Sequence, residues 1–91
     1  MVTVGMAKEF ARDYLGTLKA NGMKNTFRSV KEIARLMNIS VDKAIRFIGV
    51  AKANDFMCDD NNTMPSYMPS LTLFKVYETN LLGGKANGKV L

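Results

Sequence analysis

The sequence predicts one small domain that is mainly α-helical and carries a small β-hairpin. Apolar residues recur at steps of three and four in three segments between residues 6 and 54, as on amphipathic helices. The pattern then changes to two short runs rich in aromatic and β-branched residues, which indicate strands. The 91 residues are too few for two cores, so we expect a domain over residues 1–80 and a flexible, glycine-rich basic tail over residues 81–91.

The first helix is expected over residues 6–21, where apolar positions make one stripe and charged residues fill the opposite face. The stripe comprises Ala7, Phe10, Ala11, Tyr14, Leu15 and Leu18. Asn21 and Gly22 follow it, and glycine readily takes the left-handed conformation that ends a helix. Residues 2–4 fit either a short strand or a loose end.

A second, short helix is expected to begin at Ser29. Ser29 and Glu32 have the spacing of a capping box, in which the serine hydroxyl accepts from the Glu32 amide and the glutamate reaches back. The buried stripe comprises Val30, Ile33, Ala34 and Met37. Asn38 follows, at a position that suits a left-handed residue. Just upstream, Thr26 and Phe27 are expected to form one extended rung, with the Phe27 ring in the core.

A third helix is expected over residues 41–54, with Ser40 as its N-cap and Asp42 in its first turn. At about 100° per residue, its side chains divide into two arcs. The arc expected to face the core comprises Val41, Ala44, Ile45, Phe47, Ile48 and Ala51. The opposite arc comprises Asp42, Lys43, Arg46, Gly49, Val50 and Ala53, which are two cations and otherwise mostly small side chains.

Residues 55–58 and 70–78 are expected to pair as antiparallel strands. Residues 59–69 contain Asp, Asn, Ser and both prolines, as in a long hairpin loop. The Asp-Asp-Asn-Asn run from Asp59 lacks the spacing, central glycine and terminal glutamate of a calcium loop, so it indicates turn chemistry. Cys58 lies among apolar strand residues and is expected to be a small buried core group.

The composition excludes several classes of function. The chain has no histidine and one cysteine, which excludes histidine-based catalysis, intramolecular disulfides and Cys/His metal sites. No cofactor, metal or enzymatic activity is expected. No apolar stretch approaches the ~18 residues of a membrane span, and residues 1–10 lack the apolar region of a secretory signal. We therefore expect no membrane partner and a cytoplasmic location.

Residues 29–57 resemble the winged helix-turn-helix family of DNA-binding domains, in which a short capped helix, a tight turn and a second helix lead into a hairpin. Ala34 matches the small residue at the helix contact, and Ile39 matches the apolar residue of the turn. Asn38 stands where the family usually has glycine, and Ala44 where it usually has Val or Ile. Phe47, Ile48 and Ala51 follow in register, and residues 54–57 match the passage into the wing.

The resemblance implies that residues 41–54 read the major groove of double-stranded DNA, because small side chains let a helix sit deep in the groove. Residues 24–52 carry seven cations and two acids, a net charge of +5 that suits a polyanion. The residues expected to contact DNA are Arg28, Ser29, Lys31, Arg35, Ser40, Asp42, Lys43, Ile45, Arg46 and Val50. The expected protein is a small sequence-specific transcriptional regulator. The family resemblance also implies a homodimer, because two copies double the site.

Two features fit the family poorly and leave alternatives open. Residues 53–74 contain no Lys or Arg, so the wing offers phosphates no cation. Met64, Tyr67 and Met68 make the loop apolar, which suits a dimer contact or a protein partner. One alternative is therefore an adaptor or inhibitor that binds a protein through this loop. Another is a DNA-binding part of a replication or partition assembly. The compact chain is also typical of viral or mobile-element proteins.

Overall fold

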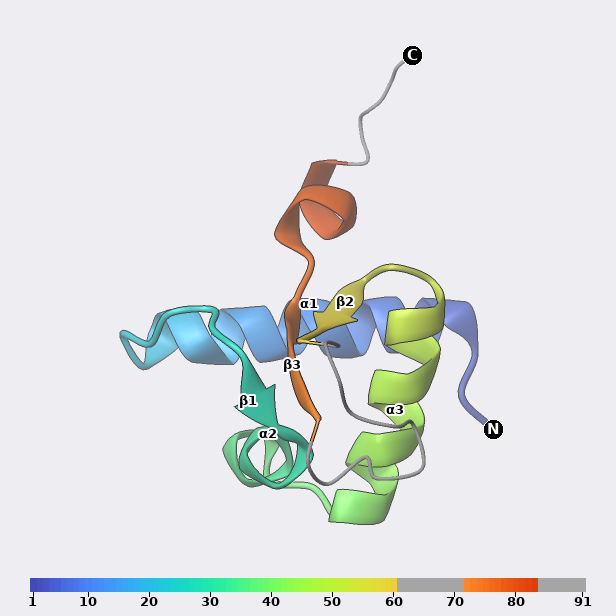
Figure 1. Ribbon diagram of the computed structural model, residues 1–91, viewed down its shortest axis with the longest axis horizontal. Coiled ribbons are helices and arrows are strands. Elements are labelled where there is room, and N and C mark those ends of the chain that lie inside the picture. The colour runs from blue at the N-terminus through green and yellow to red at the C-terminus, as the bar shows by residue number, and fades with distance from the viewer. Residues whose placement is uncertain (61–71, 84–91) are drawn as a thin grey trace.

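The domain is built from three helices and a three-stranded antiparallel sheet (Figure 1), and the computed structural model describes residues 1–60 and 72–83. The helices are α1 (Val4–Ala20), α2 (Val30–Met37) and α3 (Val41–Ala53). The strands are β1 (Arg28–Ser29), β2 (Met57–Asp59) and β3 (Leu73–Val76), and a π-helical turn, η2 (Thr79–Gly83), follows β3. The expected class, mainly α with a small β-sheet, is confirmed.

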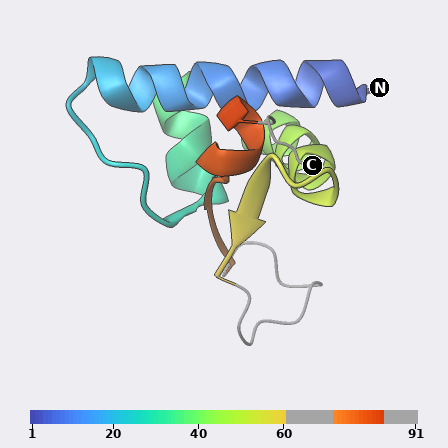
Figure 2. The same cartoon turned by 90° about the horizontal axis from the view of Figure 1, so that it is seen from above.

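Helix α1 lies along one side of the molecule, and the other elements gather on its inner side (Figures 1 and 2). Helix α3 crosses α1 near the N-terminal half of α1, and α2 lies closer to the other end. The sheet lies between α2 and α3. Each helix can therefore bury one stripe and leave its opposite face exposed.

Each helix begins with a hydroxyl side chain that accepts from a backbone amide three residues later. Thr3 accepts from Met6 at 3.1 Å, Ser29 from Glu32 at 3.1 Å, and Ser40 from Lys43 at 3.1 Å. These bonds satisfy amides that have no partner inside the helix. The hydroxyl caps expected at Ser29 and Ser40 are confirmed, but the Glu32 carboxylate, expected to reach back to Ser29, pairs with Arg35 instead. The cap at Thr3 starts α1 two residues before the expected residue 6, and places Val4 in the helix.

Each helix also ends in the same way, with one residue in the left-handed conformation. The three residues are Gly22 (φ 65°), Asn38 (φ 58°) and Asp55 (φ 62°). The next amide returns to a carbonyl five residues back: from Met23 to Leu18, from Ile39 to Ala34, and from Phe56 to Ala51. This is the Schellman motif, and the residue after the left-handed one packs on the core each time. The left-handed Asn38 is as expected.

The sheet has the strand order β1-β3-β2, with Arg28 opposite Phe74 and Met57 opposite Val76. Asn25 continues the pairing beyond β1 with its side chain. Its Oδ1 accepts from the Val76 amide at 3.0 Å, and its Nδ2 donates to the Val76 carbonyl at 2.8 Å. A side chain thus takes the place of one further strand residue.

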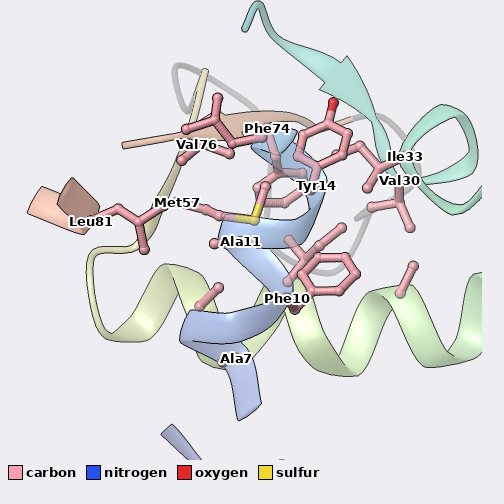
Figure 3. Packing of buried hydrophobic residues seen from close by; sticks show 14 of the residues in the cluster. Ala7, Phe10, Ala11, Tyr14, Val30, Ile33, Met57, Phe74, Val76 and Leu81 are labelled. Atoms are coloured by element: carbon pink, nitrogen blue, oxygen red, sulfur yellow. The ribbon is translucent and has the colours of Figure 1, made fainter. Parts of the chain in front are cut away.

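The core is filled by side chains that α1 directs toward the sheet, α2 and α3 (Figure 3). Phe10 packs toward α3, where its ring centre lies 5.2 Å from that of Phe47. Tyr14 is fully buried, with its hydroxyl directed toward β1 (Figure 3). Met57, Phe74 and Val76 cover the same core from the strands. The stripe expected on α1 is buried throughout.

Several expectations are wrong in detail. Residues 55 and 56 form the helix-ending turn, so β2 begins at Met57, because the left-handed Asp55 turns the chain sharply out of α3. Cys58 is only partly buried, because it pairs with Lys75 on the outer side of the sheet. Phe27 is 39% exposed, since the strand begins one residue later and its register turns Phe27 outward.

On α3, Ala44, Ile48 and Ala51 are buried as expected, but Val41 and Ile45 are each 40% exposed and do not belong to the core. No neighbouring element covers that edge of the helix within the described residues. The flexible tail was expected to start at residue 81, but Leu81 belongs to η2 and is buried. Residues 84–91 lie outside the described part of the chain.

Candidate nucleic-acid interface

The exposed face of α3 combines one arginine with small side chains. Asp42, Ile45, Arg46, Gly49 and Ala53 recur at steps of three and four, and all are exposed. This set is called the α3 face below. Gly49 has open space where a Cβ would stand, so nothing in the fold blocks a close approach there. Such a surface can approach a flat or grooved partner closely, with Arg46 as the long reaching group.

Lys43 and Val50 lie at the edge of the α3 face, on the side of α1. The Lys43 ammonium is 5.8 Å from the centre of the Phe47 ring, where a cation–π contact holds it. Lys43 also borders an apolar depression of about 240 Å³ whose α1 wall carries Glu9 and Asp13. Val50 is half-buried against the core. Both residues are therefore less available than Arg46.

Helix α2 brings two further cations beside the start of α3. Lys31 and Arg35 are exposed and border a shallow depression of about 410 Å³ that Val41 closes on the α3 side. The Arg35 guanidinium is 3.0 Å from the Glu32 carboxylate, and the Arg35 side chain is 70% exposed and that of Glu32 36%. An exposed pair of this kind is weak, so Arg35 can exchange its partner for a phosphate.

Three other expected contact residues form hydrogen bonds within the fold. The Arg28 guanidinium donates to the Lys24 carbonyl at 2.8 Å and holds the loop before β1. The hydroxyls of Ser29 and Ser40 accept the capping bonds. Ser40 is exposed and Ser29 is half-buried. The structure thus leaves Lys31 and Arg35 exposed beside the start of α3 and Ile45 and Arg46 exposed on the α3 face, and it engages Arg28 of β1 with the loop before the strand.

The β2–β3 hairpin carries acidic groups near α3, and both Asp59 and Asp60 already have partners. Asp59 lies 3.6 Å from the Lys52 ammonium. The Asp60 side chain and amide both bond to Leu73, which closes the hairpin. Met64, Tyr67 and Met68, the expected dimer or partner contacts, lie outside the described residues. The Asp59 pairing lowers the repulsion that the wing would otherwise exert on a phosphate.

A buried hydroxyl next to Arg28 is a feature that the sequence did not reveal. Tyr14 is 0% exposed, and within residues 1–60 and 72–83 its hydroxyl has no partner at hydrogen-bonding geometry. Burial raises the pKa of Tyr14, and the neighbouring Arg28 guanidinium offsets part of that rise. Tyr14 therefore stays neutral while the guanidinium lies beside it.

Across the described ranges, no helix has the length and apolar character needed to span a bilayer, and no cluster of three His, Cys, Asp or Glu side chains could hold a metal ion. The fold and its exposed helix thus define a small α-plus-β domain with a basic surface. Comparison of the chain with protein-family models, curated proteins and solved structures finds no match.

Proposed function

We propose that this protein is a winged helix-turn-helix domain that binds double-stranded DNA in a sequence-specific manner. The single observation that carries the proposal is the α3 face, where Arg46 projects among Gly49, Ala53 and the half-exposed Ile45. The order of three helices followed by a hairpin, with a tight turn between α2 and α3, supports the winged-helix assignment.

In this proposal α3 enters the major groove. Its 13 residues make a helix about 20 Å long. The groove is about 12 Å wide, and the small side chains on the α3 face keep that side of the helix narrow, which allows a close fit. Arg46 donates two hydrogen bonds to the O6 and N7 of a guanine. Ile45 contacts a thymine methyl, and Asp42 accepts from a cytosine amino group. Each residue type then has a base that it can distinguish.

The cations of α2 contact the phosphate backbone beside the groove. Lys31 and Arg35 are exposed and lie next to the start of α3, so phosphates can reach them while α3 is in the groove. Ser40 and the first amides of α3 can add a phosphate contact, because helix N-termini attract anions. These contacts fix orientation and supply affinity without reading sequence.

The biological role that follows is transcription regulation by a homodimer in the cytoplasm, bound to the nucleoid. A single α3 face reads few base pairs, and a two-fold symmetric pair doubles the site. A role in a replication or partition assembly uses the same DNA contacts. The two roles differ in where the selected site lies in a genome.

The test is selection from a random duplex pool, followed by binding curves on the selected site at two salt concentrations. We expect one selected sequence and an affinity that falls as salt rises. Arg12→Ala, an exposed arginine on α1 away from the α3 face, controls for the loss of one charge. If no duplex binds at low salt, the proposal is wrong and the adaptor alternative takes its place.

A further inference from the structure

The outer side of the sheet presents a second surface, separate from the α3 face. Strand β3 directs Phe74 and Val76 into the core, so Leu73, Lys75 and Tyr77 face outward. Cys58 pairs with Lys75 from β2. On the other side, Arg28 pairs with Phe74, which brings Phe27 opposite Lys75. Phe27, Leu73, Lys75, Tyr77 and Cys58 are called the outer sheet face below.

Two aromatic rings lie exposed on this face. Phe27 is 39% exposed and Tyr77 is 46% exposed. Every other aromatic side chain in residues 1–60 and 72–83 is buried or half-buried. Phe27 directly precedes β1 and Tyr77 directly follows β3, so the β1–β3 register, extended by one residue at these ends, places the two rings at diagonal positions. Exposed rings at this spacing are costly in water unless a partner covers them.

The segment that carries Phe27 is held rigidly. Arg28 donates to the Lys24 carbonyl, and Asn25 makes two hydrogen bonds to the backbone of Val76 and a third to the Glu78 carboxylate. The backbone segments that carry the two rings are thus joined by hydrogen bonds before any ligand binds. Such preorganisation lowers the entropy lost on binding.

One cation lies at the rings and a second lies in the loop before β1. The Lys75 ammonium is 4.9 Å from the centre of the Phe27 ring, and Lys24 belongs to the loop that leads to Phe27. Arg28 lies opposite Phe74, on the inner side of the sheet beside Tyr14. Among the described acidic groups, Glu78 accepts from Asn25, and Asp60 accepts from the Leu73 amide. A hollow of about 280 Å³ opens between Lys75 and Tyr77. Flat rings beside cations suit a ligand that has both planar bases and phosphates.

We propose that the outer sheet face binds single-stranded DNA, with one base stacked on Phe27 and a neighbouring base stacked on Tyr77. In a duplex the faces of the bases are covered by their neighbours, so only an unpaired strand offers them to the protein. When a base covers Phe27, the Lys75 ammonium leaves the ring and contacts the phosphate between the two bases. The choice of DNA over RNA rests on the proposed function of the α3 face.

The experiment uses the full chain, which contains no tryptophan. Phe27→Trp and Tyr77→Trp each introduce a single indole on the outer sheet face, and Val4→Trp introduces one at an exposed position of α1 as the matched control. An oligothymidine of about 12 nucleotides is titrated into each variant. We expect stacking to quench the fluorescence of the first two variants and to leave the Val4→Trp signal unchanged.

Affinity is measured in parallel with Phe27→Leu, Tyr77→Leu and Lys75→Met. Loss of one ring should weaken oligothymidine binding about fivefold to a hundredfold, since stacking on an aromatic ring contributes about 1–3 kcal/mol per base. Lys75→Met should lower the salt dependence. Thermal melting verifies the fold of each variant, and Phe27→Trp and Tyr77→Trp give a readout that keeps a ring at each of the two positions.

Duplex binding separates this proposal from the previous one. Phe27→Leu and Tyr77→Leu should leave affinity for the selected duplex unchanged, and Arg46→Ala should leave oligothymidine affinity unchanged. The proposal is overturned if the wild-type chain does not bind oligothymidine at low salt, or if binding survives the loss of both rings. Tighter binding to the matching RNA strand would overturn the choice of DNA.

Discussion

Arg46 has the most demanding part in the proposed reading of DNA. Its side chain is exposed on the α3 face and lies between Asp42, one turn before, and Gly49 and Val50, one turn after. Its side chain is exposed, and no described residue pairs with its guanidinium. A bidentate contact to guanine therefore requires no internal bond to break.

The substitution Arg46→Ala is expected to weaken binding to the selected duplex about fivefold to a hundredfold, in line with about 1–3 kcal/mol for a bidentate contact. Because the side chain is exposed, the melting temperature should not change. Binding curves on the selected and scrambled duplexes measure both affinity and preference. Equal loss for Arg12→Ala would mean that net charge alone explains the effect.

Tyr14 gives the protein a pH dependence in the alkaline range. Burial raises the pKa of Tyr14 in the folded state above its ordinary value of 10.0. The free energy of unfolding does not depend on Tyr14 ionisation below about pH 10, and it falls as the pH rises from there through the folded-state pKa. The unfolded chain then releases the proton more readily than the folded one.

In Tyr14→Phe the alkaline loss of stability should be smaller than in the wild type. At neutral pH the substitution should leave stability unchanged or raise it, because the hydroxyl has no hydrogen-bond partner in the described part of the chain. Thermal melting across the range from neutral to alkaline pH measures both effects. Tyr77→Phe, at an exposed position, is the matched control and should keep the wild-type profile.

At the scale of elements, the three helix ends share one construction but use different residues. Gly22 takes the left-handed conformation without a steric penalty, whereas Asn38 and Asp55 bear a Cβ there. Asparagine and aspartate tolerate this conformation better than other residues with a side chain. The turn after α3 also sets the start of β2, so Asp55 determines where the β2–β3 hairpin leaves the helix.

We expect Asp55→Ala to lower the free energy of unfolding by about 1 kcal/mol, because alanine adopts the left-handed conformation poorly. Asp55→Gly should match or exceed the wild type. Asp13→Ala removes an exposed aspartate from the middle of α1, where alanine is favoured, and serves as the control. Chemical denaturation of the three variants gives the comparison, and equal stabilities for Asp55→Ala and Asp55→Gly would remove this role.

Helix α2 is expected to supply affinity without sequence preference. The double variant Lys31→Ala and Arg35→Ala should weaken binding to selected and scrambled duplexes alike. The slope of log affinity against log salt should fall by about two, about one for each lost phosphate contact. Binding curves at several salt concentrations measure the slope. A loss of preference with an unchanged slope would assign these residues to base contacts instead.

At the scale of the molecule, a homodimer predicts a symmetric DNA site. Two α3 faces related by a two-fold axis should select half-sites whose centres lie about one helical turn apart, about 34–36 Å, or a multiple of it. Sequencing of the selected pool measures the spacing, and sedimentation measures the mass on and off DNA. A selected site without inverted symmetry, bound by one copy, would contradict the dimer.

The helices were predictable from the sequence because their signals are local. Apolar spacing, the hydroxyl residues at Ser29 and Ser40, and the left-handed Asn38 act within a few positions of one another. The same holds for the small side chains on the α3 face, which the helical period alone places together. Whether Ile45 is covered depends instead on how α2 lies beside α3, which the period does not contain.

The sheet was less predictable, because its contacts join distant residues. A strand of two residues, such as β1, has no alternation to recognise. The outward direction of Phe27 depends on its register with Lys75. Asn25 adopts its position only when Val76 lies beside it to share hydrogen bonds. Arg28 was predicted from charge alone, which does not reveal that the Lys24 carbonyl already receives its guanidinium.

The middle position of β3 in the sheet has a consequence for the order of events during synthesis. All three helices precede β3 in the chain, yet Phe74, Val76 and Leu81 complete the core that the helices share. At about 5–20 residues per second, the ribosome needs roughly a few seconds to pass from the end of α3 to Leu81. Throughout that interval the buried stripes of α1 and α3 lack their cover, so the nascent chain offers chaperones an apolar surface that the finished protein no longer has.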